Sequence, residues 1–382
     1  MVRLNDNFQE EVYYMNRYWL VFSLILIGVG PLSLRVQAQS GIPSPLNQAG
    51  FGPPGPETQA KIAKQLALEA ATPKLQITEE VLPLSVPGHT IGETEGVSMN
   101  SQGHLFVYSR TGQAGSSRGG TAAELFEFDQ NNKFVKMWGA DNYAASFAHS
   151  VRVDKNDNVW MVDEGSSMIV KFDPEGMVNM VFGRKPEAID YMERYIERGE
   201  KDTDPHPVGD VGSFNRPTDV AWDAAGNIFV SDGYGNSRVI KIDKSGNWQK
   251  VVGTHGSGDN QFSTPHGIAT DAQGNVYVAD RGNNRIQVYD NNLNFKQSIT
   301  GVASPWTVQV TPKYLYSGDG FTGKIYQLDH TGKLLGWMQT GLGHGEDFCL
   351  IHELHAVSDN VIIKGDCATW IVEKITIKQS SR

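Results

Sequence analysis

The stretch "TPHGIATDAQGNVYVADRGNNRIQVYD", Thr264–Asp290, decides the fold of this chain. Apolar residues alternate with polar or small ones in "GIAT", "NVYVAD" and "RIQVYD", a pattern typical of half-buried β-strands. Between the first two segments, "DAQGN" combines Asp, Gly and Asn, the residues that favour a tight turn. The stretch therefore predicts a strand, a tight turn, a second strand and a third strand.

This phrase recurs along the chain. When the copies are aligned on the position of His266, they begin with "TEGVSMN", "AHSVRVD", "PTDVAWD", "PHGIATD", "PWTVQVT" and "IHELHAV". The aligned positions are Glu95, His149, Thr218, His266, Trp306 and His352. Repeats of roughly 40–45 residues that each contain several strands are typical of β-propellers. We therefore predict an all-β fold, a six-bladed β-propeller.

The propeller is expected to span residues 75–382. The segment "LQITEEVLPL", which precedes the first copy, is predicted to complete the last blade and close the ring. The longest spacing, between His149 and Thr218, contains an insertion near residues 186–212, with a short helix predicted from Pro186 to Gly199.

The N-terminal region is predicted to lie outside the fold. The apolar run "YWLVFSLILIGVG" is short for a membrane span and is followed by Val36-Gln37-Ala38, a pattern typical of signal-peptide cleavage. We interpret residues 1–38 as a signal peptide, with Met15 as an alternative start, and an uncleaved anchor as the alternative. Residues 39–74 are predicted to be a Pro/Gly-rich spacer with a short helix. The protein is therefore expected to be exported, to the periplasm or the extracellular space, and to meet a membrane only if the apolar segment is retained.

The formal net charge of −10 argues against a nucleic-acid partner, because nucleic-acid binding depends on basic surfaces. The chain contains only two cysteines, Cys349 and Cys367, and an exported protein permits them to pair. We expect the protein to be a monomer.

Three histidines share the aligned position in alternate copies: His149, His266 and His352. The first strand of each propeller blade lines the central channel, so three alternate blades direct these imidazoles to one point on the axis. Zinc accepts three histidine ligands and leaves a fourth position open in catalytic sites. The pattern therefore predicts a metal site, with zinc as the expected ion; three unrelated buried histidines are the alternative. His355 is expected to point to the other face of its strand.

A second ring of polar residues is predicted where the second strands end at the same mouth. Arg110, Glu164, Tyr234 and Arg281 occupy these positions. Two arginines and a tyrosine near a metal suit an anionic substrate with a proton to move. Structural salt bridges are the alternative role for the two arginines.

The copies "FNRPTDVAWDAAGNIFVSDGYGNSRV" and "TPHGIATDAQGNVYVADRGNNRIQ" resemble NHL-repeat propellers, and within these the lyase domain of peptidylglycine α-amidating enzymes. The resemblance covers Leu75 to Ile377. It implies zinc ligands at His149, His266 and His352, a catalytic tyrosine at Tyr234 and catalytic arginines at Arg110 and Arg281.

The resemblance also implies a structural calcium ion near the carbonyl groups of Val97 and Val151 and the carboxylate of Glu353. The family has aspartate at this last position, methionine where this chain has Leu350, and cysteine where it has Gly235. The implied reaction cleaves a peptidyl-α-hydroxyglycine into a peptide amide and glyoxylate.

The substrate implied by these residues is a small anionic or peptidyl compound. The sequence contains no second domain that would produce an α-hydroxyglycine, so the natural substrate stays open. A non-enzymatic NHL-repeat binding module and a metal-dependent hydrolase such as a lactonase remain the alternative functions.

Overall fold

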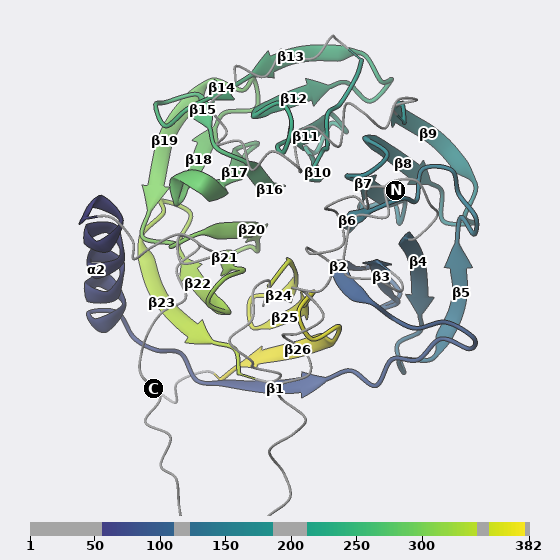
Figure 1. The fold of residues 1–382 in the computed structure, drawn as a ribbon, viewed down its shortest axis with the longest axis horizontal. Helices are drawn as coiled ribbons and strands as arrows, with labels where there is room; N and C mark the ends of the chain where they lie inside the picture. The colour runs from purple at the N-terminus through teal and green to yellow at the C-terminus, as the bar shows by residue number, and fades with distance from the viewer. Residues whose placement is uncertain (1–55, 111–122, 186–211, 342–350, 379–382) are drawn as a thin grey trace, which may run out of the picture. The chain divides into compact units, whose positions relative to one another are not determined.

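The computed structural model describes residues 56–110, 123–185, 212–341 and 351–378. These residues form six four-stranded antiparallel sheets arranged as blades around a central axis (Figure 1). The prediction of an all-β, six-bladed propeller is therefore confirmed. The predicted signal peptide, residues 39–55 of the spacer and the insertion helix from Pro186 to Gly199 lie outside the described residues.

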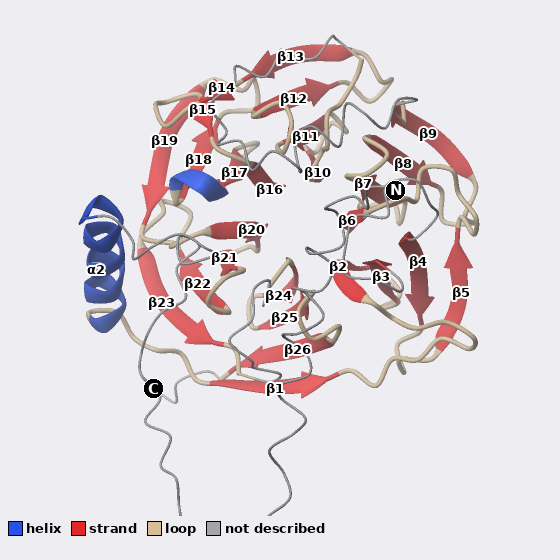
Figure 2. Ribbon diagram, in the orientation of Figure 1, coloured by secondary structure: helices blue, strands red, loops and turns tan. Residues whose placement is uncertain are grey.

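Each blade is a meander, and its first strand lies innermost (Figure 2). Blade 1 comprises β2 (Glu93–Met99), β3 (Leu105–Arg110), β4 (Ala123–Phe128) and β5 (Phe134–Trp138). Blade 2 comprises β6 (Ala148–Val153), β7 (Val159–Asp163), β8 (Met168–Phe172) and β9 (Val178–Gly183). Blade 3 comprises β10 (Asp219–Trp222), β11 (Ile228–Asp232), β12 (Arg238–Ile242) and β13 (Trp248–Val252).

The second half of the ring repeats this plan. Blade 4 comprises β16 (Pro265–Thr270), β17 (Val276–Asp280), β18 (Arg285–Tyr289) and β19 (Phe295–Thr300). Blade 5 comprises β20 (Pro305–Val310), β21 (Leu315–Asp319), β22 (Lys324–Leu328) and β23 (Leu334–Gln339). Blade 6 comprises β24 (Glu353–Ser358), β25 (Val361–Gly365), β26 (Val372–Ile377) and the N-terminal strand β1 (Ile77–Val81).

Strand β1 closes the ring. It pairs antiparallel with β26, from Ile77 opposite Ile377 to Val81 opposite Glu373. The N-terminal strand β1 and the C-terminal strand β26 thus share one sheet, and their pairing closes the ring at this blade (Figure 1). This pairing was expected from the segment "LQITEEVLPL".

The turn in the opening stretch shows why the repeats form hairpins. The Asp271 carboxylate accepts hydrogen bonds from the backbone N–H groups of Gln273 at 2.9 Å and Asn275 at 2.8 Å. Gly274 adopts φ +83°, a left-handed conformation that glycine takes at little cost. The side-chain amide of Asn275 donates to the other Asp271 oxygen at 2.6 Å. The "DAQGN" segment therefore fixes the register of β16 and β17.

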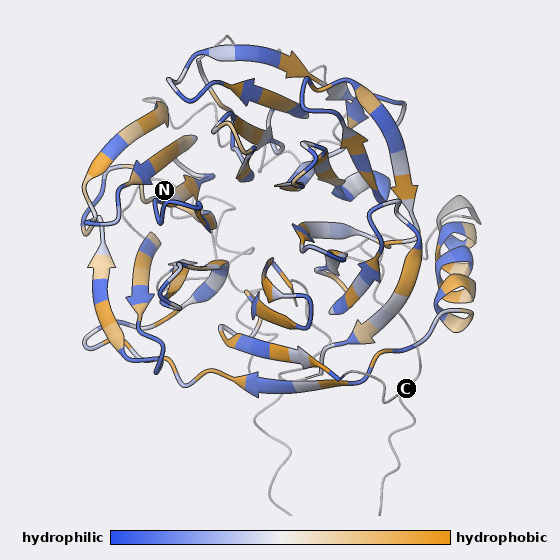
Figure 3. Ribbon diagram, turned by 180° about the vertical axis from the view of Figure 1, so that it is seen from behind, coloured by the Kyte–Doolittle hydropathy of each residue, from blue (hydrophilic) through white to orange (hydrophobic). Residues whose placement is uncertain are grey.

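The hydrophobic core lies between neighbouring blades. Along the strands, apolar residues alternate with polar ones (Figure 3). One cluster joins blade 4 to blade 5 and contains the buried residues Tyr277, Ile286, Val308 and Leu315. Because each sheet packs on the next, the first strands are held rigidly around the axis.

Three short elements complete the described part of the chain. A parallel pair, β14 (Thr254–His255) with β15 (Gln261–Phe262), precedes blade 4, and the 3-10 helix η2 (Arg281–Asn283) follows β17. The helix α2 (Pro56–Ala70) packs on blade 5. Its buried Glu69 accepts hydrogen bonds from Lys324 at 2.6 Å and Tyr326 at 2.7 Å, which anchors the helix.

Candidate metal centre

The first strand of every blade carries one extra residue at its inner end. In β6, for example, Ala148 lies opposite Asp163 and Ser150 lies opposite Val162, so His149 has no opposite residue of its own. Such a β-bulge re-aims a side chain away from the regular alternation of the sheet. The six residues at these bulges are Glu95, His149, Thr218, His266, Trp306 and His352. The fold therefore places one side chain from each blade on the axis.

The three histidines of this set converge. Their ring centroids lie 4.6 Å apart for His149 and His266, 4.7 Å for His149 and His352, and 5.0 Å for His266 and His352. Among the described residues, their nitrogen atoms form the one group of potential metal ligands, all within 4.8 Å of one another. All three side chains are buried.

Each imidazole is oriented by the next blade. The Nδ1 atoms of His149 and His266 lie 2.6 Å from the carbonyl oxygens of Thr218 and Trp306, and Nδ1 of His352 lies 2.7 Å from the carbonyl oxygen of Glu95. A carbonyl oxygen only accepts, so Nδ1 carries the proton and Nε2 keeps its lone pair. Hydrogen bonds of this kind fix the tautomer and the direction of metal-binding histidines.

His149 and His266 are in the neutral form that binds a metal. Burial, followed by the charges of neighbouring histidines, holds the pKa of His149 well below its ordinary value. Burial, followed by the Arg281 charge, does the same for the pKa of His266. His149 Nε2 is buried and has no hydrogen-bond partner among the described residues, a cost that a bound cation removes. The residues present therefore fit a divalent metal ion.

Tyr234 and Arg281 lie beside the imidazoles. The Tyr234 hydroxyl lies 3.3 Å from Nε2 of His266 and accepts a hydrogen bond from Arg281 at 3.2 Å. Burial raises the pKa of Tyr234, so its hydroxyl is protonated at neutral pH. The Arg281 guanidinium stacks over the Trp306 ring at 4.5 Å and forms no ion pair with any carboxylate of the described residues. Its charge is therefore available to an anion.

Arg110 has different surroundings. Its guanidinium lies 3.0 Å from Glu95, 3.2 Å from Glu93 and 3.7 Å from Glu164. Its Nε donates to the carbonyl oxygen of Ala148 at 3.0 Å. The charge of Arg110 is thus already matched by carboxylates, in contrast to that of Arg281.

On the other side of the imidazoles, an ion pair fills the axis. Glu353 accepts hydrogen bonds from the backbone N–H groups of Val97 and Val151 at 3.2 and 3.4 Å. The Arg152 guanidinium lies 2.7 Å from Glu353 and 2.5 Å from Asp219. Calcium binds oxygen ligands, whereas the groups that contact this carboxylate are two backbone N–H donors, the Ser150 hydroxyl at 3.0 Å and the Arg152 cation. The predicted calcium site stays a prediction, and we derive no step from it.

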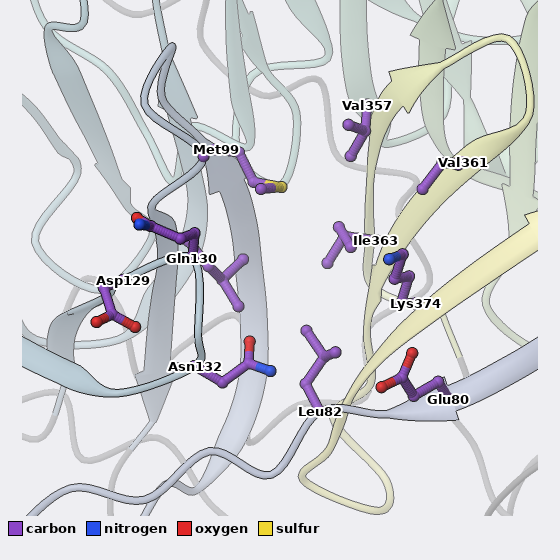
Figure 4. Close-up of a pocket in the computed structure, with 12 residues that line it drawn as sticks. Glu80, Leu82, Met99, Asp129, Gln130, Asn132, Val357, Val361, Ile363 and Lys374 are labelled. Carbon is purple, nitrogen blue, oxygen red and sulfur yellow. The ribbon is translucent and has the colours of Figure 1, made fainter.

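A separate groove lies at the seam between blades 1 and 6 (Figure 4). Leu82, Met99 and Ile363 form its apolar part, and Glu80, Asp129 and Lys374 contribute charges. It contains neither the histidines nor Tyr234, so it is distinct from the candidate metal centre.

The sequence comparison with known families matches residues 262–289, which include His266 and the "DAQGN" turn, to the NHL repeat. Together with the six four-stranded sheets, this match decides the architecture. The protein is a six-bladed propeller, and one of its repeats matches the NHL repeat.

Curated relatives of this propeller are named as amidating enzymes. A probable peptidyl-alpha-hydroxyglycine alpha-amidating lyase from Caenorhabditis elegans is 31% identical over 179 residues, covering 44% of this chain and 46% of that protein. A peptidylglycine alpha-amidating monooxygenase from Rattus norvegicus is 24% identical over 326 residues, covering 75% of this chain and 31% of that protein. The chain thus spans less than half the length of either relative.

Solved structures share the architecture of the propeller. The virginiamycin B lyase from Staphylococcus aureus superposes with a TM-score of 0.52 at 10% identity, covering 80% of this chain and all of that chain. At this identity the likeness shows the fold alone.

The sequence prediction named the three histidines, Tyr234, Arg110 and Arg281, and the structure brings all six together at one mouth of the propeller. It did not assign a role to Glu95, although the aligned repeats place this residue on the ring. It also missed Glu93 and Arg216. Arg216 lies outside the repeated positions, pairs with Glu164 and stacks over Tyr234 at 4.7 Å.

Two further predictions concern the pairing of the two cysteines and the N-terminal apolar run. Cys367 is disulfide-bonded, and Cys349, the other cysteine of the chain, lies outside the described residues. No helix in the described parts of the chain is long and apolar enough to cross a membrane. The apolar run before Ala38 also lies outside those parts.

Proposed function

We propose that this propeller is a zinc-dependent carbon–nitrogen lyase that cleaves a peptidyl-α-hydroxyglycine, or a compound of the same chemical class, into an amide and glyoxylate. The observation that carries the proposal is the convergence of three buried, oriented imidazoles beside Tyr234 and Arg281. The names of the curated relatives support the same reaction class.

The reaction moves one proton and breaks one bond. The hydroxyl of the α-hydroxyglycine loses its proton, the carbon–oxygen bond becomes a carbonyl, the carbon–nitrogen bond breaks, and the amide nitrogen takes up a proton. A bound divalent ion supplies Lewis-acid chemistry that lowers the pKa of a hydroxyl group. The ligands for that ion are His149, His266 and His352.

The remaining residues bind the substrate and move the proton. Arg281 binds the substrate carboxylate, because its guanidinium forms no ion pair with a carboxylate of the described residues and it lies at the mouth beside Tyr234. The protonated Tyr234 hydroxyl donates a hydrogen bond to the reacting oxygen or nitrogen and relays the proton. Arg110 is surrounded by carboxylates. It positions those acids and balances their negative charge at the mouth, and it is not the sole group that binds the substrate.

We further propose that the propeller is exported to the periplasm or the extracellular space and acts there as a monomer. This rests on the apolar run ending at Ala38.

The decisive experiment combines metal analysis with turnover. Metal-loaded protein is incubated with an α-hydroxyglycine model peptide, and glyoxylate and the peptide amide are both quantified. We expect the two products in equal amounts, lost in a His149→Ala variant that retains the fold. A bound metal without turnover would support the binding-module alternative, and turnover of lactones instead would support a hydrolase.

A further inference from the structure

Arg216, which precedes β10, connects the side chain of Tyr234 to blade 2. Its guanidinium pairs with the carboxylate of Glu164 and lies over the Tyr234 ring, with the central guanidinium carbon 4.7 Å from the ring centroid. The backbone N–H of Arg216 donates a hydrogen bond to the Ser167 hydroxyl at 3.1 Å. Its carbonyl oxygen accepts a hydrogen bond from the Tyr234 N–H at 3.3 Å. Both the backbone and the side chain of Arg216 therefore contact Tyr234.

The blade 2 side of this connection is fixed in place. Glu164 and Ser167 are both buried. The Glu164 N–H donates a hydrogen bond to the carbonyl oxygen of Phe147 at 3.1 Å, and the Ser167 N–H donates to the carbonyl oxygen of Glu164 at 3.4 Å. A guanidinium is planar, so it loses its ion pair with a fixed carboxylate when it turns away. Glu164 thus holds the guanidinium of Arg216 over the Tyr234 ring.

The position of Tyr234 depends on the groups around it, because this residue is only half-buried. Its ring meets the imidazoles of His149 and His266 edge to face, with centroids 5.5 and 5.9 Å apart. Two guanidiniums lie over the ring, that of Arg216 at 4.7 Å and that of Arg281 at 5.3 Å. A cation over an aromatic face is attracted to it, and of these two cations Arg216 is the nearer.

The charges around Arg216 distinguish its role from that of Arg281. The Arg216 guanidinium is paired with Glu164, whereas Arg281 forms no ion pair with a carboxylate of the described residues. An ion pair has no net charge, so it attracts an anionic substrate far less than a single cation does. Arg216 is therefore expected to affect the rate through Tyr234 and to contribute little to substrate binding.

We propose that Arg216 is a positioning residue for the reaction, which holds the Tyr234 ring so that its hydroxyl lies beside His266 and Arg281. This rests on the proposed function, in which Tyr234 moves the proton. A displacement of about 1 Å at a reacting group can lower a rate by about 10²-fold, so the orientation of this ring matters for turnover. Glu164 completes the arrangement by fixing Arg216.

The first test is a double-mutant cycle in full-length, metal-loaded protein with the α-hydroxyglycine model peptide. Arg216→Met removes the planar cation and retains an unbranched side chain. We expect kcat to fall by about 10- to 100-fold and KM to change by less than about threefold. Tyr234→Phe has no hydroxyl to position, so in that background Arg216→Met should lower kcat by less than about threefold. Equal losses in the two backgrounds would overturn the proposal.

Two further variants separate the stacked guanidinium from its charge. Arg216→Lys retains the positive charge beside Glu164 but has no planar face, and we expect its kcat to stay about tenfold below that of wild type. A wild-type kcat in this variant would overturn the role of the stacked guanidinium. The matched control is Lys136→Met. It removes a cation that lies 4.2 Å from the Trp138 ring on the outer strand β5, and we expect it to leave kcat unchanged.

The second test does not depend on turnover. In crystal structures of wild type and Lys136→Met, we expect one conformation of the Tyr234 side chain, with the hydroxyl beside His266. In Arg216→Met we expect a displaced ring or two ring conformations. An unchanged Tyr234 in Arg216→Met would overturn the positioning role and leave the proposed function intact.

A displaced ring in Arg216→Met, together with a wild-type protein that produces no glyoxylate, would instead refute the proposed function and retain the contact between Arg216 and Tyr234. Thermal unfolding checks that each variant folds. Glu164→Gln removes the charge that holds Arg216 in place, so it gives a second measurement with the same expected fall in kcat.

Discussion

Nδ1 of His352 donates a hydrogen bond to the main-chain oxygen of Glu95, 2.7 Å away, and so joins the last blade to the first at the axis. His149 joins blade 2 to blade 3 in the same way, and His266 joins blade 4 to blade 5. The hydrogen bonds that orient the candidate metal ligands are thus also contacts between blades. We therefore expect the binding of a metal to be coupled to the packing of the propeller.

This coupling predicts that the metal stabilises the fold. Wild-type protein is expected to contain close to one divalent ion per chain, and the double variant His149→Ala, His266→Ala to contain none. A ligand bound at 100 times its dissociation constant stabilises a protein by about 2.7 kcal/mol. Elemental analysis and thermal unfolding with and without added Zn²⁺ measure both effects. Equal metal contents in the two proteins would contradict the prediction.

Tyr234→Phe is expected to retain the fold and the metal but to lower turnover of the α-hydroxyglycine peptide by about 10²- to 10⁴-fold. The variant removes one hydroxyl from a half-buried ring, which costs on the order of 1 kcal/mol of stability. Steady-state kinetics, metal analysis and thermal unfolding separate the two effects. A wild-type rate in this variant would exclude proton transfer by Tyr234.

Arg281 is expected to determine substrate binding. Arg281→Ala should raise KM by roughly 10- to 100-fold, since a hydrogen bond to a charged group contributes about 1.5–3 kcal/mol. Arg281→Lys retains the positive charge and should show a smaller rise. The matched test is a substrate analogue whose carboxylate is replaced by an amide. If Arg281 binds the carboxylate, wild type and Arg281→Ala should bind this analogue with similar affinity.

The ion pairs of Arg152 are expected to stabilise the propeller, and this stability is expected not to depend on added calcium. Arg152→Met leaves Glu353 and Asp219 buried beside one another without their cation, and breaking a buried ion pair typically costs about 3–5 kcal/mol. Urea unfolding measures this loss. Added Ca²⁺ should leave the unfolding midpoint of wild type unchanged; a marked rise would support the calcium site implied by the family resemblance.

The export proposal predicts a new N-terminus. Protein isolated from its native host should begin at Gln39, as read by N-terminal sequencing. An intact N-terminus on protein recovered from the membrane fraction would support the anchor instead.

The sequence predicts the fold well because each repeat contains the residues that determine its own strands and turns. Each hairpin carries its own turn residues, as Asp271 and Gly274 do, so six copies identify the propeller. The three histidines were predictable for the same reason, since they share one aligned position. Arg216 was not predictable, because it precedes β10 in a loop that the repeat does not define. Salt bridges were the alternative role predicted for Arg110, and Glu164 was placed in its ring, but the contribution of Glu93 and Glu95 escaped prediction because neither residue was assigned a role.

The six bulges determine how the residues that line the axis of this propeller can change by substitution. A bulged residue has no opposite residue in the sheet. The choice of its side chain is therefore limited mainly by the neighbouring side chains on the axis and little by strand pairing. Thr218 and Trp306 occupy two such positions between the histidines. Replacing either residue changes the lining of the axis while the blades keep their register. The scaffold thus has six positions around one centre. Substitutions at these positions, made one at a time, change the set of side chains that can bind a metal or a substrate.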